Sequence, residues 1–189
     1  MLSHAISPNT ILAVPLHGSN AALHDSITQA QGSFSQTVSG ITKLLHLQIP
    51  VEIRVVVSKY NFYDLLDLAK LIAKTMPTAY RVHFVGLEML GNAAVNSKNV
   101  WIPYGEAFAA IKPAANMLIS AGINVGIYNF PLCAVEPDYW PLCKKSISEY
   151  KRKFLAACQN CSCLHICGGV FSGSLRFAET NLHPINRVN

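Results

Sequence analysis

The sequence predicts an α/β fold with about four parallel strands alternating with helices, followed by a small cysteine-rich region. Three observations support this prediction. Short apolar runs rich in β-branched residues alternate with segments of helical periodicity. Only 13% of the 189 residues are charged and 51% are hydrophobic, which is typical of a buried α/β core. All cysteines lie in the last third of the chain, from Cys133 onward.

The first predicted strand is the apolar run I-L-A-V-P-L at residues 11–16, which we expect to be buried. A polar loop follows. A helix is expected to open at Ser33, because Ser33 and Gln36 form a capping box. Its apolar face repeats at helical spacing through Phe34, Val38, Ile41 and Leu45.

The run V-E-I-R-V-V-V-S at residues 51–58 predicts a second strand covered on both faces. Asn61 is expected to cap the helix that follows, which ends at Pro77. Its apolar side consists of Leu65, Leu68, Ile72 and Met76. Residues 80–86 predict the third strand.

Residues 87–99 are rich in glycine and asparagine and predict a loop. A helix is expected over residues 105–120, interrupted or kinked at Pro113. Residues 123–130 predict the fourth strand. Strands that alternate with helices imply right-handed crossovers and a parallel sheet, whose ligands gather at the carboxyl ends of the strands. Four strands do not close a barrel, so the sheet is either a small open one or the second part of a larger barrel.

The strand–helix rhythm stops after Pro131, which divides the chain into residues 1–131 and a cysteine-rich region at residues 132–189. A link rich in proline and aromatic residues leads to a basic helix expected around residues 146–155. We interpret its lysines and arginine as a solvated face that could also engage an acidic peptide. The last residues, 172–189, show little pattern.

The cysteine spacing is the most informative motif. Cys158, Cys161 and Cys167 form C-x2-C-x5-C, with Cys163 between the last two. Thiolates are the ligands of iron–sulfur clusters and of structural zinc, which need about four donors. Three ligands are therefore local, and Cys133 is the first choice for the fourth because it follows a predicted strand. Cys143 and Cys163 are its rivals.

The setting of these thiols favours metal over disulfides. The first nine residues are polar and contain Pro8, so we expect no secretory signal. No apolar run approaches the length of a membrane span, and we expect a cytoplasmic protein with no membrane partner. Clustered cysteines in a reducing compartment are more often metal ligands than disulfides or free buried thiols. The net charge of +5 is modest, and we expect no nucleic-acid partner.

Several segments resemble the second half of a radical S-adenosylmethionine (SAM) enzyme, from about residue 11 to residue 169. They are L-H-G-S-N-A-A-L-H-D with the later G-S-F, then I-R-V-V-V-S-K-Y-N, and the C-x2-C-x5-C motif. That motif is similar to the auxiliary-cluster motif of SPASM or twitch-type members that modify peptides. Y-N-F-P-L-C, S-I-S-E-Y-K and C-G-G-V-F look closest to the His-Xaa-Ser system maturases.

The resemblance implies a partial TIM-like barrel. In the family, one [4Fe–4S] cluster cleaves SAM reductively, and the resulting 5′-deoxyadenosyl radical abstracts hydrogen from a substrate, often a peptide or small protein. An auxiliary [4Fe–4S] cluster would be held here by Cys133, Cys158, Cys161 and Cys167. The family places SAM contacts at strand ends, which points to His17, Ser19, Arg54 and Asn61. Arg54 has an alternative role as an ion-pair partner of Glu52 or Glu88, and Asn61 as a helix cap.

The chain departs from the family in lacking the C-x3-C-x2-C motif that holds the SAM cluster. By strand count the first three strand–helix units are missing too. This predicts a truncated reading frame, a split enzyme or a degenerate copy. A second chain that supplies the missing barrel half would dock at the edge of the first strand. The alternative function is a non-catalytic module that binds zinc or an iron–sulfur cluster and a peptide.

Overall fold

The chain folds around one five-stranded parallel sheet. In the computed structural model, residues 10–178 and 182–186 are described. The strands of the sheet are β1 (Leu12–Pro15), β2 (Val51–Val57), β3 (Arg81–Gly86), β4 (Val125–Tyr128) and β5 (Cys143–Lys144). Their spatial order is β1-β2-β3-β4-β5, the same as in the sequence, and each neighbouring pair is parallel.

The helices lie between the strands in sequence. They are α1 (Ala21–Thr28), α2 (Ser33–His46), α3 (Leu65–Thr75), α4 (Asn92–Val95), α5 (Ser97–Val100) and α6 (Tyr104–Ser120). A 3-10 turn, η1 (Phe62–Asp64), leads into α3. Among these, α2, α3 and α6 are the long helices that cover the sheet.

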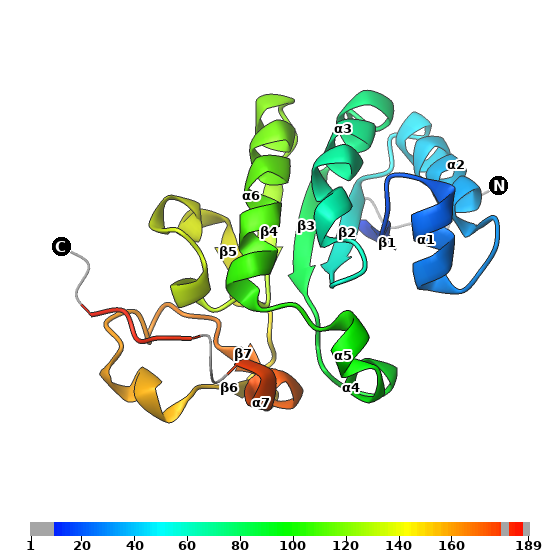
Figure 1. The fold of residues 1–189 in the computed structure, drawn as a ribbon. Coiled ribbons are helices and arrows are strands. Elements are labelled where there is room, and N and C mark those ends of the chain that lie inside the picture. The colour runs from blue at the N-terminus through cyan, green and yellow to red at the C-terminus, as the bar shows by residue number, and fades with distance from the viewer. Residues whose placement is uncertain (1–9, 179–181, 187–189) are drawn as a thin grey trace.

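The sequential strand order fixes where the helices go. When every crossover is right-handed and moves in the same direction, all crossover helices lie on one face. Figure 1 shows α3 and α6 side by side in front of the sheet, with α2 beyond them next to β1. A doubly wound sheet would instead reverse its order and carry helices on both faces. The fold is therefore a sector of a TIM-like barrel, as the sequence predicts, with one strand more than expected.

The core lies between the sheet and these helices. Val51, Ile53, Val55 and Val57 alternate along β2, and all point into the same buried cluster. They meet the apolar faces of α3 and α6, whose fully buried side chains include Leu68, Ile72, Ile111 and Leu118. Burial of such side chains contributes roughly 1.5–3 kcal/mol each and holds the strand ends in place.

Several local predictions are wrong. Residues 21–28, expected as a loop, form α1. Ser33 is the first residue of α2 and not its N-cap: the start of the helix is tied by Asp25, whose carboxylate accepts the N–H groups of Gly32 and Phe34. β1 is a half-exposed edge strand and not a buried one. α6 continues through Pro113 without interruption.

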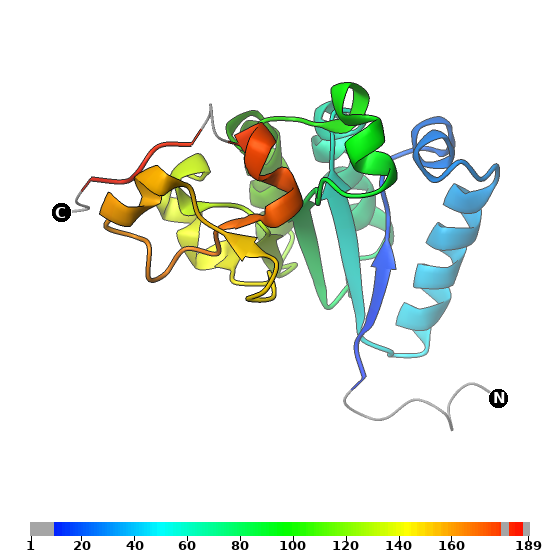
Figure 2. The ribbon, with the colours of Figure 1, turned by 90° about the horizontal axis from the view of Figure 1, so that it is seen from below.

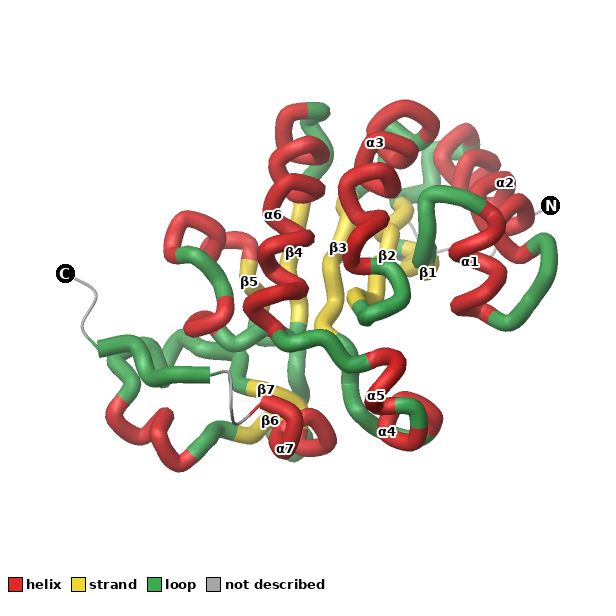
Figure 3. Tube along the Cα trace, viewed as in Figure 1, coloured by secondary structure: helices red, strands yellow, loops and turns green. Residues whose placement is uncertain are grey.

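The cysteine-rich region lies below the carboxyl ends of the strands in Figure 1, next to β4 and β5. Figure 2 shows it at the end of the sheet opposite to α1 and α2. It consists mostly of loops and short turns (Figure 3). Its regular elements are η2 (Leu132–Ala134), η3 (Pro137–Leu142), η4 (Ala156–Asn160), η5 (Ser172–Ser174), α7 (Leu175–Ala178) and an antiparallel pair of β6 (Arg152–Lys153) with β7 (Val170–Phe171).

The basic helix expected around residues 146–155 does not form. Turns and strand β6 occupy this segment, because its charged residues offer no apolar face for a helix to bury. The division at residues 131 and 132 remains a prediction, and β5 joins the sheet from beyond it. The nine N-terminal residues on which the signal prediction rests, and part of the patternless tail, lie outside the described residues. No helix in the described part of the chain is long and apolar enough to cross a membrane.

Candidate functional site

Five of the six thiols line one cavity between the sheet and the C-terminal loops. Cys133 enters it from the segment that follows β4, and Cys158, Cys161, Cys163 and Cys167 enter from the loop region between β6 and β7. The free space in the cavity is about 20 Å³, room for roughly one water molecule. Its other walls are mainly apolar: Pro131, Leu132, Phe154, Leu155, Leu164, Val170, Leu182 and Ile185. The four predicted ligands therefore share one cavity, whereas Cys143 does not line it.

Two of these sulfurs accept backbone N–H groups at hydrogen-bond distance. The amide of Ile185 donates to Cys161 Sγ and that of Gly169 to Cys167 Sγ, each at 3.4 Å. Burial raises the pKa values of Cys133 and Cys158, and the backbone amides of His183 and Leu155 offset part of that increase. An N–H donor stabilises a thiolate, which is the form that ligates metals.

The two remaining thiols differ. Cys143 Sγ donates to the backbone carbonyl of Tyr139 at 3.8 Å, as only a protonated thiol does. Burial raises the pKa of Cys143 to about 12. Cys163 is buried, and burial followed by the nearby Cys161 and Cys167 raises its pKa. Neither sulfur accepts a backbone N–H within the described ranges.

The thiols also influence one another. Burial raises the pKa of Cys133 to about 11, and the sulfurs of Cys167 and Cys158 add to the increase. Cys167 has the same effect on Cys143, Cys158 and Cys163. Thiolates packed this closely repel one another when no cation is bound, and a bound cation stabilises their negative charge.

The cavity offers mainly sulfur donors, a set that iron–sulfur clusters and structural zinc both use. Zn²⁺ needs four donors at about 2.3 Å from one point. Within residues 10–178 and 182–186, no three His, Cys, Asp or Glu side chains converge in a way that could hold one ion. The five sulfurs of the cavity come from two separate segments of the chain, Cys133 and residues 158–167.

A second pocket lies at the carboxyl ends of β1, β2 and β3. His17, Ser58 and Leu87, which line it, follow these three strands. The rest of its lining includes Tyr60, Asn92 and Asn96. This is the edge at which parallel sheets collect ligands.

His17 is the predicted SAM contact that keeps an unused polar atom. Its Nδ1 is buried and has no hydrogen-bond partner in the described part of the chain. Its imidazole is stacked beside that of His24, with 5.9 Å between ring centroids, and its backbone N–H donates to His24 Nδ1. Burial, reinforced by His24, lowers the pKa of His17 to about 4, so the ring is neutral at pH 7.

Ser19 and Asn61 are engaged within the protein. The N–H and Oγ of Ser19 both donate to the carboxylate of Asp64, at 2.7 and 2.6 Å. Asn61 is 1% exposed, and its Nδ2 donates to the carbonyls of His17 and Val56 while Oδ1 accepts the N–H of Ser58. Asn61 therefore ties the end of β1 to the end of β2. It makes no side-chain capping bond, so the predicted capping role is wrong.

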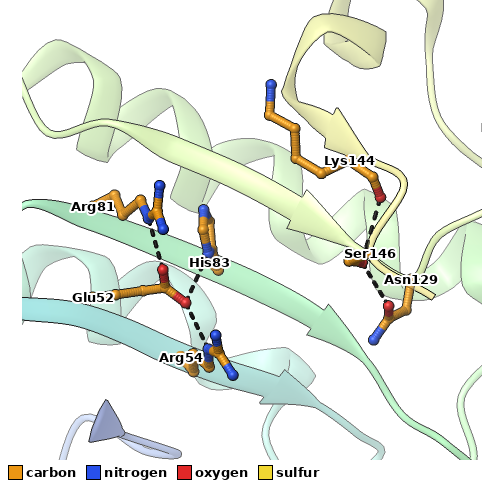
Figure 4. Close-up of polar contacts among 7 residues, drawn as sticks. All are labelled: Glu52, Arg54, Arg81, His83, Asn129, Lys144 and Ser146. Atoms are coloured by element: carbon orange, nitrogen blue, oxygen red, sulfur yellow. Dashed lines mark hydrogen bonds and ion pairs between the residues drawn. The ribbon is translucent and has the colours of Figure 1, made fainter. Parts of the chain in front are cut away.

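Arg54 pairs with Glu52, the first of the two alternatives considered for it. Figure 4 shows Glu52 between Arg54 and Arg81 on the sheet face opposite to the helices. The two arginine Nε atoms lie 2.6 and 2.7 Å from separate oxygens of its carboxylate. His83 Nδ1 lies 3.1 Å from Glu52 Oε1, close enough for an ion pair but without hydrogen-bond alignment. Burial raises the pKa of Glu52, but the two arginines outweigh it and lower the pKa to about 2.

A second polar contact in Figure 4 joins Asn129 to Ser146. Asn129, at the end of β4, has a left-handed backbone with φ of 63°. Its Oδ1 accepts the hydroxyl of Ser146 at 2.7 Å, which joins the end of β4 to the segment after β5. Asn129 is followed closely by Pro131 and Cys133, which line the cavity. The turn at Asn129 and its contact with Ser146 therefore help to position these two residues.

The fold and this site define an α/β protein with a thiol-lined cavity beside the carboxyl end of a parallel sheet. No protein-family model matches the sequence, and no curated protein sequence matches it. Among solved structures, a domain of pyruvate-formate lyase-activating enzyme from Bacteroides vulgatus ATCC 8482 is similar over 62% of this chain and 66% of its own length, with 11% identity and a TM-score of 0.47. A radical SAM methyltransferase from Sphaerobacter thermophilus is similar over 66% of this chain, with 16% identity and a TM-score of 0.46. The match covers only 36% of that methyltransferase.

Sequence reasoning missed two parts of the site. The Glu52–Arg81–His83 network was not predicted, although charged residues at alternate positions of an apolar strand, as in V-E-I-R, are a signal for it. The amide donors at His183 and Ile185 leave no signal in the side-chain sequence, because any residue other than proline carries an N–H.

Proposed function

We propose that this chain is a radical SAM-type protein whose cysteine-rich region holds an auxiliary [4Fe–4S] cluster. The ligands are Cys133, Cys158, Cys161 and Cys167. The observation that carries this proposal is the shared cavity: all four sulfurs line it, and backbone N–H groups donate to Cys161 and Cys167. Cys143 lies outside the cavity and donates to a backbone carbonyl. When bound, such a cluster supplies one-electron transfer.

The protein's own residues prepare the cavity for this role. The apolar walls limit access of water, and the N–H donors offset part of the negative charge of four thiolates. Asn129 and Ser146 hold the segment that carries Cys133 against the sheet. Gly169, with φ of 68°, turns the chain directly after Cys167 so that its own amide reaches the sulfur.

SAM, in this proposal, occupies the pocket at the carboxyl ends of β1, β2 and β3. The unpaired Nδ1 of His17 supports a ligand there, and its neutral ring suits a hydrogen bond better than an ion pair. Ser19, Arg54 and Asn61 would act by shaping the strand ends, since each already has a partner within the protein. A peptide or small protein, as in the His-Xaa-Ser system maturases, is the proposed substrate.

We further propose a second chain that carries strands able to pair with β1 and the C-x3-C-x2-C motif. The outer edge of β1 supports this, because β1 is the terminal strand of the sheet and has a half-exposed face. The competing function is a metal-binding module that engages a peptide through a basic helix. It loses support because that helix does not form.

The deciding experiment is the iron and acid-labile sulfide content of the protein, purified without oxygen, together with its visible spectrum. About four irons per chain with broad visible absorption are expected from one Cys-ligated cubane cluster. One zinc and no iron would keep the thiol site and exclude its redox role. The absence of both metals would contradict the proposal.

A further inference from the structure

The described C-terminal segment, residues 182–186, lies against the thiol cavity. We call it the C-terminal strap. Leu182 is 6% exposed and belongs to the main hydrophobic core, which anchors the strap. Leu182, His183 and Ile185 all line the cavity. The strap is therefore one wall of the site, although it is distant in sequence from Cys133.

Residue Ile185 of the strap both accepts a hydrogen bond from the cysteine loop and donates one to it. The carbonyl of Ile185 accepts the N–H of Ser162 at 2.9 Å, and the N–H of Ile185 donates to Cys161 Sγ at 3.4 Å. Reciprocal bonds of this kind fix the position of residue 185 relative to Cys161. Two residues earlier, His183 provides the backbone hydrogen bond to Cys133.

One short segment thus directs donors at two sulfurs that come from separate parts of the chain. An N–H dipole pointing at a cluster sulfur stabilises the more negative, reduced state more than the oxidised one. Hydrogen bonds to the sulfurs are for this reason one of the determinants of the potential of iron–sulfur proteins. Solvent exposure is another, and the side chains of the strap exclude water from the same sulfurs.

We propose that the strap is a redox-tuning element: the amides of His183 and Ile185 raise the reduction potential of the group held by Cys133 and Cys161. This inference rests on the proposed cluster and adds residues that are not ligands. Because only backbone N–H groups donate, the side chains at these positions can change while the effect persists, unless proline removes the donor.

The test compares Ile185→Pro with Ile185→Val in the full chain. Proline removes the N–H that donates to Cys161, whereas valine keeps it and keeps an apolar side chain on the cavity wall. Reduction potentials are measured by titration monitored with electron paramagnetic resonance. We expect equal iron content in both variants, a potential close to wild type in Ile185→Val, and a more negative potential in Ile185→Pro. Equal potentials in the two variants would overturn the inference.

A second measurement covers the case in which Ile185→Pro fails to retain iron. Hydrogen–deuterium exchange of the wild-type peptide containing residues 182–186 is compared before and after loading with iron and sulfide. The exchange is expected to slow on loading, since a thiolate is a stronger acceptor than a thiol. Unchanged exchange in a loaded protein contradicts the inference alone. Failure of the wild type to bind iron contradicts the proposed function and this inference together.

Discussion

The imidazole of His83 occupies the space that a side chain at residue 126 would fill. His83 and Gly126 are register partners on β3 and β4. A β-carbon on Gly126 would lie 2.5 Å from His83 Cδ2 and 2.6 Å from Nε2. The ring lies instead against Tyr128, with 4.0 Å between centroids, and it faces Glu52 on the other side. The glycine thus makes the polar network on the open face of the sheet possible.

Substitution Gly126→Ala is expected to destabilise the fold by about 1–3 kcal/mol, as overpacking does, because His83 must leave its position beside Glu52. The measurement is urea unfolding followed by circular dichroism. Gly40→Ala is the matched control: Gly40 lies in α2 with nothing near its missing β-carbon, and alanine there should stabilise by about 0.5–1 kcal/mol. Equal effects at the two positions would contradict the contact.

Because of Glu52, the free energy of unfolding is expected to decrease at acid pH. Because its pKa is lowered from 4.5 to about 2 in the fold, its contribution is complete above pH 4.5 and is lost as the pH falls through about 2. Glu52→Gln should cost about 2 kcal/mol at pH 7, less than a fully buried pair because both arginines reach solvent. The variant should also lose this pH dependence in unfolding titrations. Glu149→Gln, at a side chain 93% exposed, should change neither quantity.

His17 is expected to make the free energy of unfolding depend on pH in a second, higher pH range. Its pKa is lowered from 6.5 to about 4, so the unfolded chain binds the proton more readily and stability decreases as the pH falls through this window. The loss should be on the order of 2 kcal/mol between pH 7 and pH 4. His17→Gln should remove its share of this loss and leave the part due to His24 and His83, whose pKa values burial also lowers. NMR titration of the imidazole checks the assignment, and a His17 ring that titrates near pH 6.5 would contradict it.

Asn61 should matter for stability whether or not a ligand binds nearby. Asn61→Ala leaves the buried N–H of Ser58 and the carbonyls of His17 and Val56 without this partner. A loss of about 2–3 kcal/mol is expected in urea unfolding. Asn99→Ala, at an exposed residue, is the control and should be neutral. If Asn61→Ala is equally neutral, the side chain does not join β1 to β2 as described.

The ligand assignment predicts two groups of cysteine variants. Alanine at Cys133, Cys158, Cys161 or Cys167 should abolish iron binding, while Cys143→Ala and Cys163→Ala should retain it. Iron and sulfide analysis of the six variants, after reconstitution without oxygen, measures the difference. Iron loss in Cys143→Ala with retention in Cys133→Ala would assign the fourth ligand to Cys143.

The sheet was predictable from sequence because its strands are buried on the helix side, and burial imposes a readable pattern. In β2 the odd-numbered residues from Val51 to Val57 are buried apolar residues. In α3 the buried apolar residues recur at helical spacing. Several short elements escaped prediction, among them α1, β5, and the helices α4 and α5 in the expected loop at residues 87–99. α1 has eight residues and a single buried one, His24, and β5 has only two residues, so neither carries an apolar period of its own.

The thiols of the candidate site were predictable as a group, but their separate environments were not. Spacing places Cys158, Cys161 and Cys167 near one another, because local chain length limits their separation. It cannot show that Cys143 turns toward the carbonyl of Tyr139 while Cys133 faces the cavity. That difference depends on tertiary contacts such as Asn129 with Ser146, which join residues distant in sequence.

The position of Cys133 has a consequence for chain entropy. Cys133 follows directly from the sheet, whereas Cys158, Cys161 and Cys167 belong to loops with little regular structure. A group bound to all four would close the loop between residues 133 and 158 as a covalent cross-link does. By the relation used for disulfides, this would remove roughly 3–4 kcal/mol of unfolded-state entropy. The four bonds to the group would thus also stabilise the position of this region, which has little regular structure, relative to the sheet.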